Sequence, residues 1–554
     1  MKTLLKSGVS VAAVAMAVGL FATGTPAAAQ DAATIQAIQR QIQQLQAELH
    51  KLQVESVTRD TALKAAQAQA KAAQDQAAAA TMQATQAQQA AAAVPVAPPA
   101  APPGPPLPQG AFKVGNMTVT LGGFAAAEGI YRSRNEAASI DTNFGSIPLP
   151  YQANNHIGEF RETAQQSRFS LLAQGQFDAA DTLTSYLETD FLSAGSSSNS
   201  NQSNSYTLRL RQFWGAWDNT DWGLHLEGGQ GWSLATLYRA GLLPRQEDVP
   251  LTIDAQYVVG FDWARQAEFR IVKDFDQTYW AGLSVEEPST TFSSTPNCAT
   301  GGTEPTTAAG GGTLEYAQCG GSNVNSVTAY SDNIAPDVIA KVAADPGFGH
   351  YEAYGLLRFL GGRVDEAGSG RNYETTGEGI GGGLILPVVP KLLDFQLSGL
   401  YGRGVGRYGT SQIADVTFNT TGKIEPLTEY SVMGGLVAHP MPTVDVYAYG
   451  GAEAADRKGY GTGSGYGNGA VNLSGCFIEL GSCSASTSSI VEGTIGAWWR
   501  FIKSSYGTMQ VGAQYEYIDR DTFSGAGAAK GSTLSGPSAN ENAFLVSFRY
   551  LPFQ

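Results

Sequence analysis

Residues 167–177 read SRFSLLAQGQF, a stretch in which aromatic and aliphatic side chains alternate with mostly polar ones. Successive side chains of a β-strand point to opposite faces, so this alternation predicts a strand with one apolar and one polar face. The same pattern returns at 206–214, 393–401 and 509–517. Runs of about ten residues match a tilted strand that crosses a membrane, whereas strands of soluble folds average about five or six. The C-terminal part of the chain is therefore predicted to be an all-β transmembrane barrel.

The connections between these runs separate a membrane barrel from a soluble β-sandwich, the alternative with similar strands. Aromatic residues cluster at predicted strand ends, for example Trp498, Trp499 and Phe501, and tight turns alternate with long Gly/Ser/Thr-rich loops. Both features are typical of bacterial outer-membrane barrels. The roughly 445 residues available predict about 16 antiparallel strands, with 14 or 18 as alternatives. Side chains cannot fill a barrel of this size, so its interior is expected to hold a water-filled channel.

The N-terminus has the pattern of an export signal. Lys2 and Lys6 precede an apolar run at 9–21, and alanines at 27–29 provide a small-residue cleavage site. Residues 1–29 are therefore predicted to be a signal peptide. The alternative, an uncleaved membrane helix, is disfavoured because the apolar run is shorter than the roughly 20 residues that a bilayer requires.

A heptad repeat follows the signal peptide. Its a and d positions are occupied by Ile35, Ile38, Ile42, Leu45, Leu49 and Leu52. Such a narrow apolar seam is buried only when helices associate, and isoleucine at both positions favours three strands. With the Ala/Gln-rich sequence behind it, residues 30–93 are predicted to form an α-helical trimeric coiled-coil stalk. The Pro-rich residues 94–110 are predicted to form a stiff linker, because proline cannot continue a helix, and the barrel is predicted to occupy 111–554.

Several segments of the predicted barrel resemble the DcaP-like trimeric porins of Gram-negative outer membranes. They are GGF at 122–124, SRF at 167–169, YLETDF at 186–191, LRLRQFWG at 208–215, GQGWS at 229–233 and RQAEFR at 265–270. The resemblance is dense from residue 113 to about 285 and diffuse beyond. It implies a homotrimer of 16-stranded barrels, with the N-terminal stalk in the periplasm, and passive uptake of small, often anionic, organic solutes.

Strand alternation also assigns charged side chains to the barrel interior. The predicted pore-lining residues are Arg168, Arg209, Arg211, Arg270, Arg358, Glu188, Asp190 and Glu268. Arginines on one wall and carboxylates on another would produce a transverse field that orients a passing solute. The alternative for each arginine is an ion pair that stiffens the wall and selects nothing. The stretch 231–254 is expected, from its position alone, to be the loop that constricts the pore.

Composition and motifs exclude several classes of function. The net charge of -15 argues against a nucleic-acid partner, because phosphate neutralisation needs a basic surface. None of the five histidines lies in a metalloprotease motif or beside a nucleophile motif, so no enzymatic activity, cofactor or metal site is expected. The four cysteines form two local pairs in loop-like sequence, Cys298 with Cys319 and Cys476 with Cys483. They are expected to be loop disulfides in an oxidising compartment.

Two functions remain open at this point. The first is an outer-membrane porin, surrounded by lipid and lipopolysaccharide, through which small hydrophilic and in particular anionic carboxylate-type solutes diffuse. The second is a structural tether, in which the stalk binds peptidoglycan and the barrel serves as a membrane anchor. The Ala/Gln-rich rod favours the second function for the stalk, and the barrel favours the first.

Overall fold

The computed structural model describes residue 71 and residues 107–193, 204–293, 306–307, 312–319, 328–366 and 368–554. The chain divides into two units, residues 1–105 and 106–554, and in the first only Lys71, which is helical, is described. The predicted signal peptide, the heptad seam, most of the Pro-rich linker and Cys298 lie outside the described residues. Among those that are described, no helix is long and apolar enough to cross a membrane.

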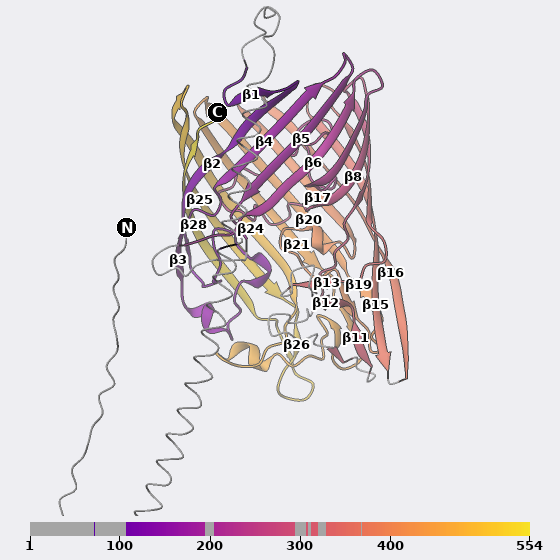
Figure 1. The fold of residues 1–554 in the computed structure, drawn as a ribbon. Helices are drawn as coiled ribbons and strands as arrows, with labels where there is room; N and C mark the ends of the chain where they lie inside the picture. The colour runs from indigo at the N-terminus through magenta and orange to yellow at the C-terminus, as the bar shows by residue number, and fades with distance from the viewer. Residues whose placement is uncertain are drawn as a thin grey trace, which may run out of the picture. The chain divides into compact units, whose positions relative to one another are not determined.

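Sixteen antiparallel strands close into a barrel (Figure 1). The first, β2 (Met117–Arg132), pairs with the last, β28 (Ser538–Leu551), and this pairing closes the ring. Between them, in chain order, lie β4 (Arg168–Gln176), β5 (Asp181–Asp190), β6 (Arg209–Asn219), β7 (Leu224–Trp232), β8 (Arg265–Phe275), β9 (Tyr279–Glu286), β14 (Asp337–Ala344), β15 (His350–Glu366), β16 (Ser369–Val389), β17 (Leu393–Arg403), β20 (Thr428–Met441), β21 (Val444–Ala455), β24 (Thr487–Ser504) and β25 (Gly507–Thr522). The predicted transmembrane barrel and its strand number of about 16 are confirmed, whereas only Lys71 of the predicted N-terminal coiled coil is described.

Smaller elements accompany the barrel strands. Two short strands pair with β2: β1 (Ala111–Val114) and β3 (Glu159–Thr163). The long loops contain β10 (Thr306–Thr307), β11 (Thr313–Glu315), β12 (Ala317–Cys319), β13 (Ala329–Ser331), β18 (Val416–Phe418), β19 (Ile424–Pro426), β22 (Lys458–Tyr460), β23 (Ser464–Tyr466), β26 (Gly525–Ala526) and β27 (Thr533–Leu534). Four single-turn 3-10 helices are η1 (Phe144–Ser146), η2 (Ala153–His156), η4 (Gly406–Tyr408) and η5 (Ser474–Phe477).

The barrel wall has an apolar outer face. On β28, Phe544, Val546 and Phe548 are exposed, while Ser547 between them is only 4% exposed. On β4, Phe169 is exposed and its neighbour Ser170 is buried. Polar side chains therefore point into the barrel and apolar ones point away from it, as the alternation in the sequence predicts.

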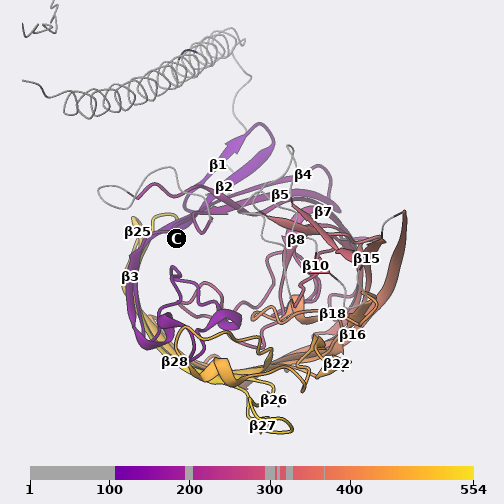
Figure 2. The ribbon, with the colours of Figure 1, turned by 90° about the horizontal axis from the view of Figure 1, so that it is seen from below.

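Among the fully described loops, residues 133–158, 233–264 and 404–427 fold into the barrel instead of away from it (Figure 2). The side chains of Ile140, Ile253 and Phe261 are fully buried and belong to a core cluster with inward side chains of β20, β21 and β28. The hydrophobic core of this unit therefore lies inside the ring of strands. The expectation that the loop beginning near residue 231 enters the barrel agrees with the contacts, although the inserted segment extends to Ala264.

Candidate functional site

Loop 233–264, called here the inner loop, is held by glutamates of the barrel wall. Backbone N–H groups of the loop donate to carboxylates on four separate strands: Leu234 to Glu286 (2.9 Å), Tyr238 to Glu352 (3.1 Å), Val259 to Glu492 (2.7 Å) and Gly260 to Glu453 (2.8 Å). A buried N–H without a partner costs about 1–3 kcal/mol, and each of these carboxyl groups covers one such donor. Inward carboxyl groups thus satisfy the buried backbone of the loop, and they are themselves buried.

Glycines let the inner loop lie directly on the wall. Gly260 has a φ of +85°, and a Cβ there would lie 2.0 Å from the carbonyl oxygen of Val432. A Cβ on Gly451 of β21 would lie 1.8 Å from the carbonyl oxygen of Val259. Both glycines are therefore required for backbone-to-backbone contact at this point.

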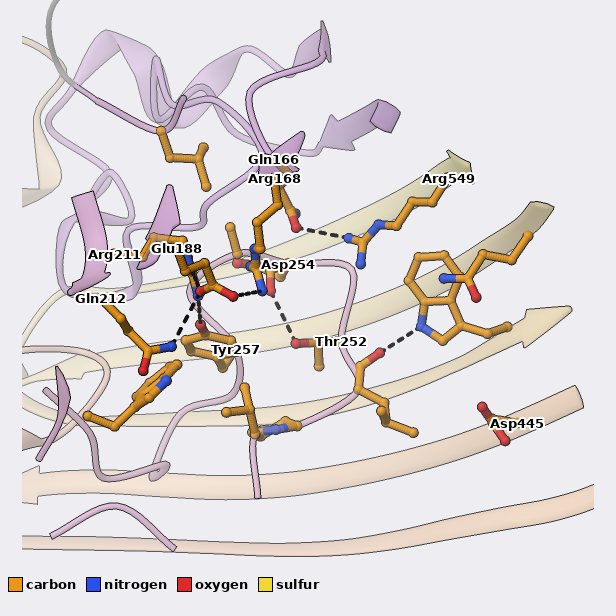
Figure 3. Close-up of a pocket in the computed structure, with 18 of the residues that line it drawn as sticks. Gln166, Arg168, Glu188, Arg211, Gln212, Thr252, Asp254, Tyr257, Asp445 and Arg549 are labelled. Carbon is orange, nitrogen blue, oxygen red and sulfur yellow. Dashed lines mark hydrogen bonds and ion pairs between the residues drawn. The ribbon is translucent and has the colours of Figure 1, made fainter. Parts of the chain in front are cut away.

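A cavity of about 270 Å³ remains between the inner loop and the wall (Figure 3). The loop contributes residues 249–252, 254, 255 and 257, and the wall contributes β4, β5, β6, β7, β21, β24, β25 and β28. The charged side chains that line the cavity are Arg168, Glu188, Arg211, Asp254, Asp445, Arg500 and Arg549. The inner loop therefore narrows the barrel beside a set of four arginines and three carboxylates.

Two of the predicted arginines are bound in ion pairs on neighbouring strands. Arg211 of β6 lies 2.6 Å from Glu188 and 2.9 Å from Asp190 of β5. Arg209 lies 2.8 Å from the same Asp190. Arg211 is only 3% exposed, and its Nη2 also donates to the Tyr257 hydroxyl at 3.3 Å. These contacts support the interpretation of Arg209 and Arg211 as wall ion pairs.

Two titratable groups of the inner loop line the cavity, and both have displaced pKa values. Burial raises the pKa of Asp254 to about 6, although Arg132 and the N–H of Thr142 act in the opposite direction. Burial also acts to raise the pKa of the Tyr257 hydroxyl, but the positive charges of Arg211, Arg265 and Arg168 outweigh it and the pKa is lowered. The electrostatic potential at the Tyr257 hydroxyl is therefore positive.

No protein-family model and no curated protein sequence matches this chain. The crystal structure of the outer membrane channel DcaP of Acinetobacter baumannii matches it with a TM-score of 0.55 and 19% identity, over 80% of this chain and 100% of that one. The chain has the fold of a DcaP-like porin. An anion-selective porin from Comamonas acidovorans matches with a TM-score of 0.41 and 12% identity, over 78% of this chain and 99% of the porin. OmpT of Vibrio cholerae matches with a TM-score of 0.41 and 10% identity, over 80% and 99%.

Within this DcaP-like fold, loops cover three of the predicted pore-lining residues, Glu268, Arg270 and Arg358. Arg270 is 1% exposed, and it contacts Glu268 at 2.8 Å and the hydroxyl of Tyr238 in the inner loop at 2.6 Å. Arg358 is fully buried and contacts Asp337 at 3.1 Å and Asp415 at 2.8 Å. Alternation gives the correct inward direction for these side chains. They do not line the cavity, because loops 233–264 and 404–427 lie over them.

Other lining residues were not predicted. Arg549 of β28 lies 2.7 Å from Glu128, donates to Gln166 at 2.9 Å and lies over the Trp498 ring at 4.6 Å. Its alternation with Phe548 in the last strand is a signal that would have placed it inside. Asp254 and Tyr257 lie on the inner loop, where no strand periodicity exists to predict their direction.

The described cysteines, Cys319, Cys476 and Cys483, do not line the cavity. Cys476 and Cys483 form a disulfide with an S–S distance of 2.08 Å, beside η5 in the loop between β23 and β24. Cys319 is also disulfide-bonded, while Cys298 lies outside the described residues. In the described part of the chain, no group of three or more His, Cys, Asp and Glu side chains has the geometry of a metal site.

Proposed function

We propose that this protein is an outer-membrane porin through which small hydrophilic solutes diffuse passively. The observation that carries this proposal is the combination of a closed barrel, an apolar outer face and an inner loop that leaves a charged cavity against the wall. Membrane barrels of this size enclose aqueous channels. The catalytic alternative has no support from the arrangement, because most charged groups of the cavity are used in ion pairs and loop contacts.

The proposal includes a preference for anionic solutes such as carboxylates. Four arginines and three carboxylates line the cavity, and one of those carboxylates, Asp254, has a raised pKa of about 6. Permeation depends on the local charge along the pore and not on the net charge of the protein. The local balance therefore favours anions even though the chain as a whole is acidic.

The proposal also keeps the predicted assembly. The protein would be a homotrimer in outer-membrane lipid and lipopolysaccharide of a Gram-negative bacterium, with its signal peptide removed. Residues 30–93 would form the periplasmic coiled-coil stalk, joined to the barrel by the Pro-rich linker. A tether to peptidoglycan through this stalk is compatible with a channel. Cell-wall detachment on deletion of residues 30–108, with unchanged permeability, would assign the tether to that segment.

Single-channel recording of the purified protein in a planar bilayer tests the channel. We expect openings that close in three equal steps and a reversal potential under a KCl gradient that indicates anion preference. A purified, folded trimer without conductance would contradict the proposal and leave the tether as the function.

A further inference from the structure

Most arginines near the cavity are neutralised by a close carboxylate. Glu188 and Asp190 neutralise Arg211, as described above, and Glu128 neutralises Arg549. Asp445 accepts a hydrogen bond from Arg500. Such pairs present little net charge to a passing ion, so these arginines contribute weakly to selectivity despite their number.

Arg168 is only partly compensated. Its Nη1 lies 3.6 Å from Oε2 of Glu188, which is longer than a hydrogen bond. Glu188 already accepts hydrogen bonds from Arg211 at 2.6 Å and from the Tyr186 hydroxyl at 3.0 Å. The Nε of Arg168 is buried without a partner in the described structure, and the guanidinium lies over the Phe124 ring at 5.3 Å.

Arg265 forms no ion pair with a carboxylate of the described residues. Its Nε and Nη1 are buried and have no hydrogen-bond partner there. Its guanidinium instead lies over the rings of Trp232 at 5.1 Å and Trp263 at 5.2 Å, and these two rings meet edge to face at 5.7 Å. An aromatic face attracts a cation through its quadrupole but carries no net charge. The two tryptophans therefore stabilise Arg265 without cancelling its positive charge.

The strand end that carries Arg265 has left the regular wall. Arg265 shares its face of β8 with Phe269, which is 54% exposed, so alternation alone would place Arg265 outside the barrel. Arg265 pairs with Trp232, however, and Trp232 lies beyond Phe213–Gln230, the last pair between β6 and β7. At this end Trp232 is 5% exposed, packs against Tyr257 of the inner loop and lines the cavity. Arg265 is not itself a lining residue, and its charge lies next to the cavity, over the ring of Trp232.

The lowered pKa of Tyr257 shows that these positive charges act together at its hydroxyl. Its hydroxyl accepts a hydrogen bond from Arg211 at 3.3 Å, and its pKa is lowered by Arg211, Arg265 and Arg168 against the effect of burial. The same field that stabilises a phenolate would stabilise the charge of a solute anion at this place.

We propose that Arg265, held between Trp232 and Trp263, is the main specificity-determining cation of the pore, with Arg168 as the second. The ligand is the anionic group of a small solute, a carboxylate, sulfonate or phosphate, which passes beside the Tyr257 hydroxyl. This inference rests on the proposed channel function, and it assigns to Arg209 and Arg211 a role in holding the wall.

The test compares Arg265→Gln with Arg403→Gln, which removes the same charge from an exposed arginine paired with Glu378 at 3.3 Å on the surface of the barrel. We expect Arg265→Gln to lower the anion-to-cation permeability ratio by ~3-fold or more in KCl. At about 1 M KCl, where exposed charges are screened, Arg403→Gln should leave the ratio unchanged. Equal ratios for wild type and Arg265→Gln in a conducting channel would overturn the inference alone, whereas a silent wild-type channel would overturn the proposed function.

Two further measurements cover the case in which Arg265→Gln does not fold. Arg265→Lys retains the charge and should retain the anion preference, while Arg168→Gln should lower the permeability ratio by a smaller factor than is expected for position 265. The Tyr257 titration, read as the ultraviolet difference between wild type and Tyr257→Phe, should shift to higher pH in Arg168→Gln. If Arg168→Gln changes neither the Tyr257 titration nor the anion-to-cation permeability ratio, the inference is overturned. Potassium acetate, methanesulfonate and phosphate in place of chloride then distinguish which anionic group is preferred.

Discussion

Glu453 and Glu492 show how a single inward carboxylate can serve structure instead of permeation. Each lies on a barrel strand and accepts a backbone N–H from the inner loop at 2.8 and 2.7 Å. A buried N–H without a partner costs about 1–3 kcal/mol, so each glutamate stabilises the inserted loop by covering such a group. The acidic surplus of the barrel therefore reflects in part the loops that it must hold inside.

Asp254 makes the position of the inner loop sensitive to pH. It accepts hydrogen bonds from the N–H groups of Thr142 and Gln256, and its pKa is raised from 3.8 to about 6, with burial as the largest cause. Burial likewise raises the pKa of Glu136, from 4.5 to about 7. A carboxyl with a raised pKa favours folding while it is protonated, so this contribution is complete below about pH 4 and is lost as the pH rises through 6 to 7.

We therefore expect the thermal stability of the barrel to fall between about pH 4 and pH 7, and to fall less in Asp254→Asn. Asparagine keeps an acceptor for the N–H of Thr142 but has no charge to bury. Melting followed by circular dichroism in detergent across this range measures the effect. Asp276→Asn, on an exposed turn, is the control. Parallel pH profiles for wild type and Asp254→Asn would show that the burial of Asp254 does not matter.

At the scale of elements, the contact between the inner loop and β21 depends on the absence of one methyl group. Gly451 faces the loop, and a Cβ there would lie 1.8 Å from the carbonyl oxygen of Val259. Gly450, the preceding residue, faces outward, and a Cβ there would lie 3.7 Å from the carbonyl oxygen of Glu492, an ordinary van der Waals distance. The same glycine-to-alanine substitution can therefore be made on the inner face of β21 at Gly451 and on its outer face at Gly450.

Gly451→Ala is expected to push the loop off the wall and to destabilise the protein by about 1–3 kcal/mol, the usual cost of overpacking. Gly450→Ala should change the free energy of unfolding by less than about 0.5 kcal/mol. Urea unfolding in detergent measures both, and single-channel current noise should rise only in Gly451→Ala. If both variants behave alike, the inner loop is not seated on Gly451.

The strands could be predicted from the sequence, and the filling of the barrel could not. A strand is specified locally, because side chains two residues apart share a face, and residues 168–176 form β4 with Phe169 outside for that reason. The hydrogen bond from Val259 to Glu492 joins residues 233 positions apart, and no local pattern indicates it. Alternation therefore predicts the inward direction of Arg270 and Arg358, but it does not predict the loops that cover them. Arg265 was missed because its strand end leaves the regular wall.

At the scale of the whole molecule, the net charge of the chain and the local charge at the cavity are expected to have opposite signs. The chain has 34 basic and 49 acidic residues, and part of this excess lies on exposed surfaces, for example Glu374 and Glu378 of β16. Distant surface charges act on an ion only within a screening length, which is about 30 Å at 0.01 M salt and about 3 Å at 1 M. Charges at the cavity lie next to the passing ion and are screened much less.

The anion preference of the channel should therefore increase with ionic strength. At about 0.01 M salt the acidic surface attracts cations toward the pore mouth and opposes the arginines, whereas at about 1 M this contribution is screened and the charge of the cavity decides. Reversal potentials measured at a fixed concentration ratio over this range give the trend directly. Glu374→Gln with Glu378→Gln should raise the anion preference at low salt only, because neither residue lies at the cavity. A preference for anions that weakens steadily with added salt would mean that exposed charges, and not Arg168 and Arg265, determine selectivity.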